Sequence, residues 1–263
     1  MNTAKIQING KSLSYSVSGE GKPVVLLHGY LETKELWDET ASALSSKYLV
    51  ICPDLPGQGD SDSCIEQTVE SMAGSVSLLL DHLKIKKTSL FGHSMGGYVT
   101  LAFAELFSDK LDAFGLLHSH PFSDSEEKRK QRLQEIELVK KGKRELIILN
   151  SVPNYYALDF PKTHKHIVDK AIQMALKTND EGMIACISAM RNRKERLQII
   201  KNSPVPLLWI VGRKDELFPC SKALETVKEI KNISFYVLEN SGHVGMVEEA
   251  EETIKILTRF LQT

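Results

Sequence analysis

The sequence predicts an α/β protein in which helices flank a mostly parallel, eight-stranded sheet and a helical cap is inserted between two strands. Three observations support this prediction. Short continuous apolar runs, typical of strands buried on both faces, alternate with helical patterns along most of the chain. An alternating segment with a turn opens the chain, and one long block contains helical patterns without a convincing strand.

The strands can be assigned in order. Residues 6–8 and 13–17 alternate apolar and polar side chains on either side of Asn9-Gly10, which predicts an antiparallel hairpin. Continuous apolar runs predict six further strands, at residues 23–27, 48–52, 88–91, 113–118, 206–211 and 233–238. Because helical patterns separate most of these runs, we expect a parallel sheet, and the segment 247–261 predicts a closing helix.

The helical block divides the chain into two parts. We expect residues 1–121 and 200–263 to form the core and residues 122–199 to form the inserted cap, with helices at 125–141 and 162–177. In open α/β sheets, ligands bind beyond the carboxyl ends of the strands, where this block leaves and rejoins the sheet. The insertion is therefore expected to cover the site.

The composition argues against several classes of partner. The 263 residues include 33 basic and 34 acidic side chains, so a net charge of -1 gives no field that would attract nucleic acid or an anionic membrane. The charged run at 126–130 mixes both signs, which favours a solvated helix face. The expected partner is a small molecule, and the sequence leaves the oligomeric state open.

The cysteines and the hydropathy pattern set further expectations. Without the C-x-x-C spacing of a zinc or redox site, Cys52, Cys64, Cys186 and Cys220 are interpreted as free thiols. The first ten residues lack the apolar stretch of a secretory signal, and no run approaches the roughly 18 apolar residues of a membrane span. We therefore expect a cytoplasmic protein without a metal or an organic cofactor.

A candidate nucleophile lies at a junction between a strand and a helix. The segment Gly92-His93-Ser94-Met95-Gly96 follows a predicted strand and precedes a helical pattern, which is the context of the G-x-S-x-G motif. Glycines on both sides of Ser94 permit a tight turn that exposes the hydroxyl above the sheet. A glycine-rich turn with an idle serine is the alternative, so further residues have to agree.

A serine hydroxyl needs a base, and the base needs an acid that holds its tautomer. Asp215 follows the predicted strand 206–211, and His243 follows the predicted strand 233–238. Taken singly, Asp215 could cap a helix and His243 could lie on the surface. Their joint position with Ser94, at the carboxyl ends of strands in the order Ser, Asp, His, predicts a catalytic triad.

The end of an early strand supplies a candidate oxyanion hole. After Leu27 the chain continues as His28-Gly29-Tyr30, where a backbone N–H can point at the carbonyl oxygen under attack. We expect the N–H groups of Tyr30 and Met95 to bind this oxygen as the substrate-binding pair. His28 is interpreted as a structural residue without a chemical step.

Together these segments resemble the motif series of the α/β-hydrolase superfamily. The matching segments span nearly the whole chain and are His28-Gly29, Asp54-Leu55-Pro56-Gly57-Gln58-Gly59-Asp60-Ser61, Gly92-His93-Ser94-Met95-Gly96, Gly212-Arg213-Lys214-Asp215 and Gly242-His243. The chain is similar to the small capped subgroup that includes carboxylesterases, enol-lactone hydrolases and carbon–carbon bond hydrolases. The resemblance implies a helical cap above a Ser-Asp-His site, and serine at position 94 argues against dehalogenase or epoxide hydrolase activity.

Three functions remain open at this point. The first is hydrolysis of a small-molecule carboxylic ester through an acyl-enzyme on Ser94. The second is carbon–carbon bond hydrolysis or elimination on a carboxylate-bearing substrate, with Arg191 or Arg193 as the carboxylate ligand, by resemblance to such hydrolases. The third is a ligand-binding receptor that hydrolyses slowly or not at all.

Further residues are expected around the pocket. His118 and His120 are expected near the site, either touching the substrate or holding the turn, and the structural interpretation is favoured. The shape of the pocket is expected to depend on how the cap folds over the site around Ile148, Tyr155, Tyr156 and Met174.

Overall fold

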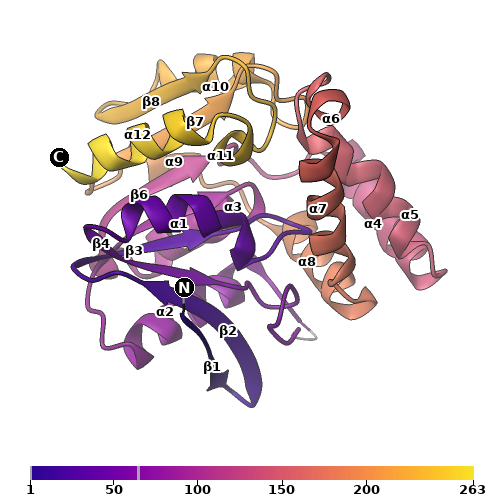
Figure 1. Cartoon of the computed structure of the whole chain (residues 1–263), viewed down its shortest axis with the longest axis horizontal. Coiled ribbons are helices and arrows are strands. Elements are labelled where there is room, and N and C mark those ends of the chain that lie inside the picture. The colour runs from indigo at the N-terminus through magenta and orange to yellow at the C-terminus, as the bar shows by residue number, and fades with distance from the viewer. Residues whose placement is uncertain (1, 64–65) are drawn as a thin grey trace.

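The computed structural model describes residues 2–63 and 66–263 (Figure 1). Its strands are β1 (Asn2–Ile8), β2 (Lys11–Ser18), β3 (Lys22–Leu27), β4 (Tyr48–Pro53), β5 (Thr88–His93), β6 (Leu111–Leu117), β7 (Leu207–Gly212) and β8 (Ile233–Leu238). They form one sheet with the order β1-β2-β4-β3-β5-β6-β7-β8. β2 runs antiparallel to β1 and β4, and the other neighbouring pairs are parallel. This sheet confirms the predicted fold class.

The opening hairpin forms at the predicted turn. Ile8 pairs with Lys11, so Asn9 and Gly10 are the two residues of the loop. Both have positive φ angles, 51° and 77° respectively, as a two-residue hairpin turn of this hand requires. The Asn-Gly dipeptide therefore sets the register of β1 and β2.

Helices cover both faces of the sheet. Successive residues of β3 point to opposite sides, with Val25 and Leu27 packing in one apolar cluster and Val24 and Leu26 in another. The first cluster includes side chains from α2 (Val69–His82), α3 (Met95–Leu106) and α10 (Cys220–Val227). The second includes side chains from α1 (Asp38–Leu44) and α12 (Ala250–Leu261). Burial on both faces explains the continuous apolar runs of the central strands.

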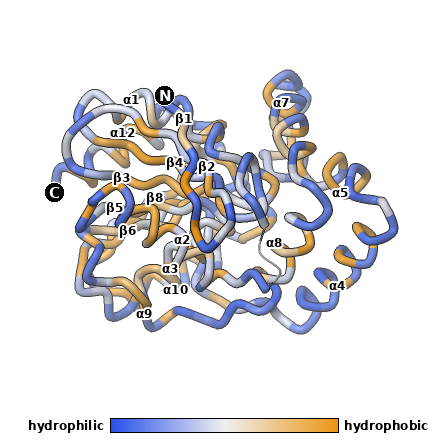
Figure 2. Tube along the Cα trace, turned by 90° about the horizontal axis from the view of Figure 1, so that it is seen from below, coloured by the Kyte–Doolittle hydropathy of each residue, from blue (hydrophilic) through white to orange (hydrophobic). Residues whose placement is uncertain are grey.

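The segment between β6 and β7 is helical. It contains α4 (Glu126–Lys140), α5 (Arg144–Ser151), η3 (Val152–Tyr155), α6 (Phe160–Thr163), α7 (Lys165–Leu176), α8 (Asp180–Asn192) and α9 (Leu197–Lys201). Figure 1 shows α4 to α8 grouped beside the sheet, and Figure 2 shows that α4 is mostly hydrophilic. α4, α5, α7 and α8 share a small apolar cluster that includes Val139, Ile148, Ala175 and Met183. These helices therefore pack on one another and on Leu31, which belongs to the same cluster.

Two expected helices are interrupted. The segment 162–177 is divided at His164, whose φ of -126° is not helical and whose ring stacks on Phe160. The closing segment is divided at Glu249, with φ of -130°, so that α11 (Gly245–Glu248) precedes α12. The Glu249 carboxylate accepts hydrogen bonds from Asn240 N–H and the Ser241 hydroxyl. Both predicted segments are therefore helical, but each is divided in two by one non-helical residue.

Cysteine state and helix length complete the description. Cys52, Cys186 and Cys220 are buried free thiols, as expected, and Cys64 lies outside the described residues. Burial raises the pKa of the Cys186 thiol to about 12. Across residues 2–63 and 66–263, none of the helices combines the length and the apolar character that crossing a bilayer requires.

Candidate active site

Ser94 occupies a strained turn between β5 and α3. Its backbone has φ of 50° and ψ of -114°, a conformation that residues with a side chain rarely adopt. The turn is held from below, because Ser94 N–H donates to the Leu117 carbonyl at 3.0 Å and the Ser119 hydroxyl donates to the Ser94 carbonyl at 2.7 Å. A Cβ on Gly96 would lie 2.5 Å from the Leu27 carbonyl oxygen, so only glycine lets α3 begin this close to β3.

Ser94, His243 and Asp215 form one hydrogen-bonded chain. Ser94 Oγ lies 2.8 Å from His243 Nε2, and His243 Nδ1 lies 2.7 Å from Asp215 Oδ2. The second oxygen, Asp215 Oδ1, accepts the N–H groups of Leu217 and Phe218 at 2.8 and 3.0 Å. These bonds orient the carboxylate so that it accepts the Nδ1 proton, which leaves Nε2 free to accept the serine proton.

The electrostatic environment keeps Asp215 ionised. Burial alone would raise the pKa of its carboxyl, but the charge and hydrogen bond of His243 outweigh burial and lower this pKa to about 2. His118 contributes to the lowering, and its Nδ1 lies 3.9 Å from Asp215 Oδ2. The result is a buried carboxylate beside an imidazole.

The sheet explains why residues so distant in sequence meet. Ser94 directly follows β5, Asp215 lies three residues beyond β7, and His243 lies five residues beyond β8. The strands β5, β6, β7 and β8 are consecutive in the sheet and parallel, so their carboxyl ends share one edge. The structure thus brings together the three residues that the sequence singled out.

The loop that carries His243 is tied to the helical segment. His243 N–H donates to the Tyr155 carbonyl at 2.6 Å. The two oxygens of Glu248 accept from Ala157 N–H at 2.7 Å and from Gly242 N–H at 2.8 Å. Burial raises the pKa of the Glu248 carboxyl to about 7 despite these donors. Glu248, which joins the histidine loop to the inserted helices, was not predicted from the sequence.

The loop after β3 lies directly beside Ser94. A Cβ on Gly29 would come within 3.1 Å of Ser94 Cβ, so the Tyr30 peptide that follows is close to the serine. Gln58 braces this loop, since its Oε1 accepts from Leu31 N–H at 2.5 Å and its Nε2 donates to the Gly29 carbonyl at 2.9 Å. Of the two proposed oxyanion donors, Tyr30 therefore lies beside Ser94 in space, and Met95 follows Ser94 in the chain.

Glu32 and His93 form a buried pair that the sequence analysis also missed. Glu32 Oε2 accepts from Gly29 N–H at 2.5 Å and lies 2.7 Å from His93 Nδ1. His93 Nε2 lies 2.8 Å from the carbonyl oxygen of His243, so this nitrogen carries a proton and donates it. The pair links the Gly29 loop, the serine turn and the histidine loop.

The other histidines have structural contacts. Leu55 N–H donates to His28 Nε2 at 2.9 Å, and His28 Nδ1 lies 2.8 Å from the Gly29 carbonyl, so this ring holds two loops together. His118 Nε2 accepts from Gly245 N–H at 3.2 Å, and burial lowers its pKa to about 3. His120 lines the cavity, lies 3.1 Å from the Tyr98 hydroxyl and packs against Phe218.

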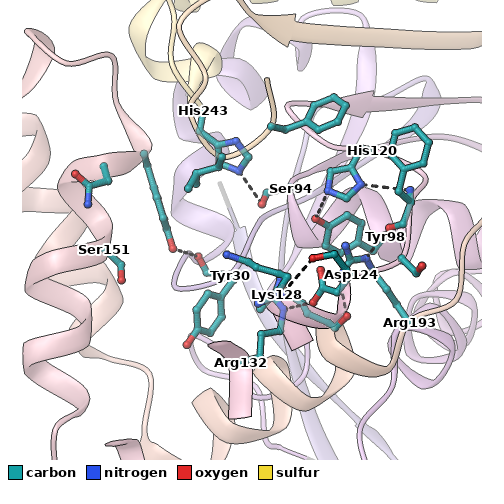
Figure 3. Close-up of a pocket in the computed structure, with 18 of the residues that line it drawn as sticks. Tyr30, Ser94, Tyr98, His120, Asp124, Lys128, Arg132, Ser151, Arg193 and His243 are labelled. Atoms are coloured by element: carbon teal, nitrogen blue, oxygen red, sulfur yellow. Dashed lines mark hydrogen bonds and ion pairs between the residues drawn. The ribbon is translucent and has the colours of Figure 1, made fainter. Parts of the chain in front are cut away.

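A cavity of about 650 Å³ opens over the serine and the histidine (Figure 3). Its wall combines core and inserted residues, among them Tyr30, Ser94, Leu217 and His243 from the core and Lys128, Arg132, Asn154, Tyr155, Met190 and Arg193 from the helical segment. Of the four residues expected to shape the pocket, Tyr155 lines this cavity, whereas Ile148, Tyr156 and Met174 do not. Ile148 is fully buried in the cluster between the inserted helices.

The two candidate arginines have different positions. Arg193 lines the cavity, but its guanidinium pairs with Asp124 at 2.7 Å and also lies 4.0 Å from the centre of the Tyr98 ring. Arg191 does not line the cavity, and its Nη1 donates to the Asn192 side chain at 3.0 Å. Neither arginine thus presents an unpaired guanidinium beside Ser94.

Comparison with known proteins agrees with this architecture. A sequence profile described as the alpha/beta hydrolase fold matches residues 22–142. The chain is 29% identical to the dihydrolipoyllysine-residue acetyltransferase component of the acetoin cleaving system of Pseudomonas putida, with 98% of this chain and 69% of that protein covered. It is 26% identical to a pimeloyl-[acyl-carrier protein] methyl ester esterase of Vibrio atlanticus, with 95% and 98% covered.

Among solved structures, a thermophilic esterase from Thermogutta terrifontis superposes with a TM-score of 0.94 at 28% sequence identity, covering 100% of this chain and 98% of that one. An enol-lactonase from Burkholderia xenovorans LB400 superposes with a TM-score of 0.91 at 22% identity, covering 99% and 100%, and shows the shared fold. Together with the sheet order and the turn at Ser94, these similarities show that the chain belongs to the α/β-hydrolase superfamily.

Proposed function

We propose that the protein is a serine esterase that cleaves a small-molecule carboxylic ester through an acyl-enzyme on Ser94. One observation carries the proposal: the hydrogen-bonded chain from Asp215 through His243 to Ser94 ends at the base of a cavity of about 650 Å³. A serine hydroxyl with an oriented base and an accessible cavity is the arrangement that acyl transfer needs.

The first half of the reaction forms the acyl-enzyme. His243 Nε2 takes the Ser94 proton while Oγ attacks the ester carbonyl carbon, and Asp215 stabilises the resulting imidazolium. The carbonyl oxygen becomes negative in this step, and we assign its stabilisation to the N–H groups of Tyr30 and Met95. The tetrahedral intermediate then breaks its bond to the alcohol, which leaves after His243 returns the proton to it.

The second half releases the acid. Water enters after the alcohol has left, His243 accepts a proton from it, and the hydroxide oxygen attacks the acyl carbon. The bond to Ser94 Oγ then breaks, the serine regains its proton from His243, and the carboxylic acid dissociates. The same two backbone N–H groups stabilise the second oxyanion, so no further group is required.

We further propose that residues 122–199 act as a cap over this site, with residues 1–121 and 200–263 as the catalytic core. Side chains from α4, α5, η3 and α8 line the cavity that contains Ser94, which supports this division. The relatives from Vibrio atlanticus and Thermogutta terrifontis are both named as esterases, which favours ester hydrolysis over carbon–carbon cleavage or a receptor role.

The test is steady-state hydrolysis of p-nitrophenyl esters of graded acyl length. Ser94→Ala is expected to lower kcat by about 10⁴-fold or more, since it removes the nucleophile. Ser123→Ala, another serine of the cavity wall, is the matched control and keeps turnover within about threefold of the native protein. Substantial turnover in purified Ser94→Ala, or none by the native protein at any acyl length, would contradict the proposal.

A further inference from the structure

The wall of the cavity on α4 carries a buried cation with open hydrogen-bonding capacity. Arg132 is 8% exposed and lines the cavity, and its Nε donates to Asp124 Oδ2. Within residues 2–63 and 66–263, its two terminal nitrogens have no hydrogen-bond partner. These two nitrogens are accessible from the cavity, so each can donate hydrogen bonds to an acceptor that binds there.

The carboxylate beside Arg132 is shared between two guanidinium groups. Asp124 Oδ1 lies 2.7 Å from Arg193 Nη1, while Oδ2 receives Arg132. Burial alone would raise the pKa of Asp124, but both arginines lower it, so the carboxylate is ionised. One negative charge between two positive charges leaves this group with a net positive charge.

Lys128, one helical turn before Arg132 on α4, adds to this excess of positive charge. Lys128 and Arg132 are four residues apart on α4, a spacing at which like charges repel each other. Burial and the charge of Arg132 lower the pKa of Lys128, and in the described chain its Nζ forms neither an ion pair nor a hydrogen bond. The charges of Asp124 and Glu135 act in the opposite direction, but the pKa of Lys128 remains lowered.

The other charged groups of the wall do not cancel this excess. Glu135 accepts the Tyr30 hydroxyl at 2.9 Å, and burial raises the pKa of its carboxyl. Lys222 enters from α10 and lies 4.1 Å from the centre of the Phe122 ring. The cavity is thus lined by four cationic side chains, Lys128, Arg132, Arg193 and Lys222, against two carboxylates, Asp124 and Glu135.

The charged side chains of this wall lie near the proposed site of ester cleavage at Ser94. Figure 3 shows Lys128, Arg132 and Asp124 on one side of Ser94, with His243 on the other side. A substrate whose ester carbonyl lies at Ser94 would therefore extend its other end toward α4. The free edge of a guanidinium offers two parallel N–H donors, which match the two oxygens of a carboxylate.

We propose that the cavity selects esters that carry a carboxylate, which Arg132 and Lys128 bind. This inference rests on the proposed esterase activity and names the substrate class of the same site. The carboxylate satisfies the free edge of Arg132 and relieves its repulsion with Lys128. A neutral ester of equal length leaves Lys128 and the terminal nitrogens of Arg132 without an acceptor, so its binding is weaker.

The kinetic test compares matched esters with and without the charge. Mono-p-nitrophenyl glutarate is compared with p-nitrophenyl valerate, and 4-carboxyphenyl acetate with 4-carbamoylphenyl acetate, so that the carboxylate lies on the acyl or on the alcohol side. The native protein is expected to favour the charged ester of at least one pair by about 10-fold or more in kcat/KM. A preference in one pair also shows which side of the ester faces α4.

The variants address the two cations separately. Lys128→Gln and Arg132→Lys are expected to lower the ratio of kcat/KM between charged and neutral ester by about 10-fold, because each weakens the carboxylate contact. Lys130→Gln lies on the same helix but outside the cavity wall and is the matched control, expected to keep the ratio. Unfolding curves of all three variants check that the fold is retained.

A binding measurement separates this inference from the esterase proposal. Calorimetry with Ser94→Ala is expected to detect binding of glutarate, weaker binding of glutaramide, and loss of glutarate binding on adding Lys128→Gln. Turnover of neutral esters without a charge preference or glutarate binding would overturn the inference and leave the esterase proposal intact. Glutarate binding that depends on Lys128, in a protein that hydrolyses no ester, would support the anion site and refute the esterase.

Discussion

The sheet edge contributes polar groups that are paired with one another to the cavity, whereas helix α4 contributes donors without a partner in the described part of the chain. At the sheet edge, Asp215, His243 and Ser94 are joined by hydrogen bonds of 2.7 and 2.8 Å, and both Asp215 oxygens are occupied. On α4, Lys128 and the terminal nitrogens of Arg132 have no partner in the described part of the chain. The polar groups at the sheet edge are thus paired with one another, whereas α4 presents donors that are free to bind a ligand.

The difference separates two tasks. Catalytic groups work best when their orientation is fixed before the substrate arrives, because reorganisation then costs nothing during the reaction. Selectivity instead requires groups whose hydrogen bonds are completed by the correct substrate and left unmade by an incorrect one. Substitutions at the sheet edge should therefore affect all esters alike, whereas substitutions on α4 should change the ranking of esters.

Among substitutions that leave Ser94 in place, the largest effect is expected from Asp215→Asn. The amide cannot stabilise the imidazolium and permits the wrong tautomer of His243, so kcat should fall by about 10³- to 10⁴-fold for charged and neutral esters alike. Glu216→Gln, at the neighbouring exposed acid, is the control and should retain native kcat. A loss confined to charged esters would show that Asp215 acts on the substrate and would break the distinction between the two walls.

A smaller effect is expected where the inserted helices meet the histidine loop. A Cβ on Gly242 would lie 2.5 Å from Ala157 N and 2.6 Å from the Tyr156 carbonyl carbon, so Gly242→Ala must displace one backbone segment. We expect the unfolding free energy to fall by about 1 to 3 kcal/mol and kcat by about 10-fold or more for every ester.

The control for this substitution is Gly74→Ala on α2, where a Cβ meets no atom within 4 Å. It should stabilise the protein by about 0.5 to 1 kcal/mol, because alanine favours a helix. Chemical unfolding and ester kinetics measure both variants. Unchanged kcat in Gly242→Ala would mean that the histidine loop does not need this junction for its orientation.

The smallest effect concerns the pH dependence of stability through Glu248. Its pKa of about 7 in the folded protein lies above the value of 4.5 expected for an unfolded chain, so the folded state holds an extra proton between these values. The unfolding free energy should therefore decrease as the pH rises from about 4.5 to 7, by an amount of the order of 1 kcal/mol given the partial exposure.

Glu248→Gln removes this titration and should flatten the slope across the same pH range, even though it also loses one hydrogen bond. Unfolding in urea at pH 5, 6 and 7 measures the slope, with Glu251→Gln, an exposed acid on α12, as the control. An equal slope in the native protein and Glu248→Gln would show that the Glu248 carboxyl does not titrate in this range.

The sheet and the residues at its edge were predictable because their signals are local. An apolar run defines each central strand, and Ser94, Asp215 and His243 lie within five residues of the ends of such runs, in a fixed order. The breaks at His164 and Glu249 were not predictable, since both positions fit a helical pattern. Glu249 leaves the helical conformation where its carboxylate binds Asn240 and Ser241, a contact that depends on the tertiary fold.

The α4 wall could not be predicted either. Within the charged run 126–130, Lys128 lines the cavity, although mixed charges suggested a solvated face. A signal did exist, because Lys128 and Arg132 place like charges one turn apart. That spacing does not say what the helix faces, and Asp124, Arg132 and Arg193 meet only after α4 and α8 have packed together.

Covalent labelling shows directly whether Ser94 is the nucleophile. Diisopropyl fluorophosphate reacts when an activated serine oxygen attacks phosphorus and fluoride leaves. Mass spectrometry of the intact protein, followed by peptide mapping, should find one diisopropylphosphoryl group per chain on Ser94 and none in Ser94→Ala. A protein that hydrolyses esters but stays unlabelled, or carries the label on another residue, would contradict the account.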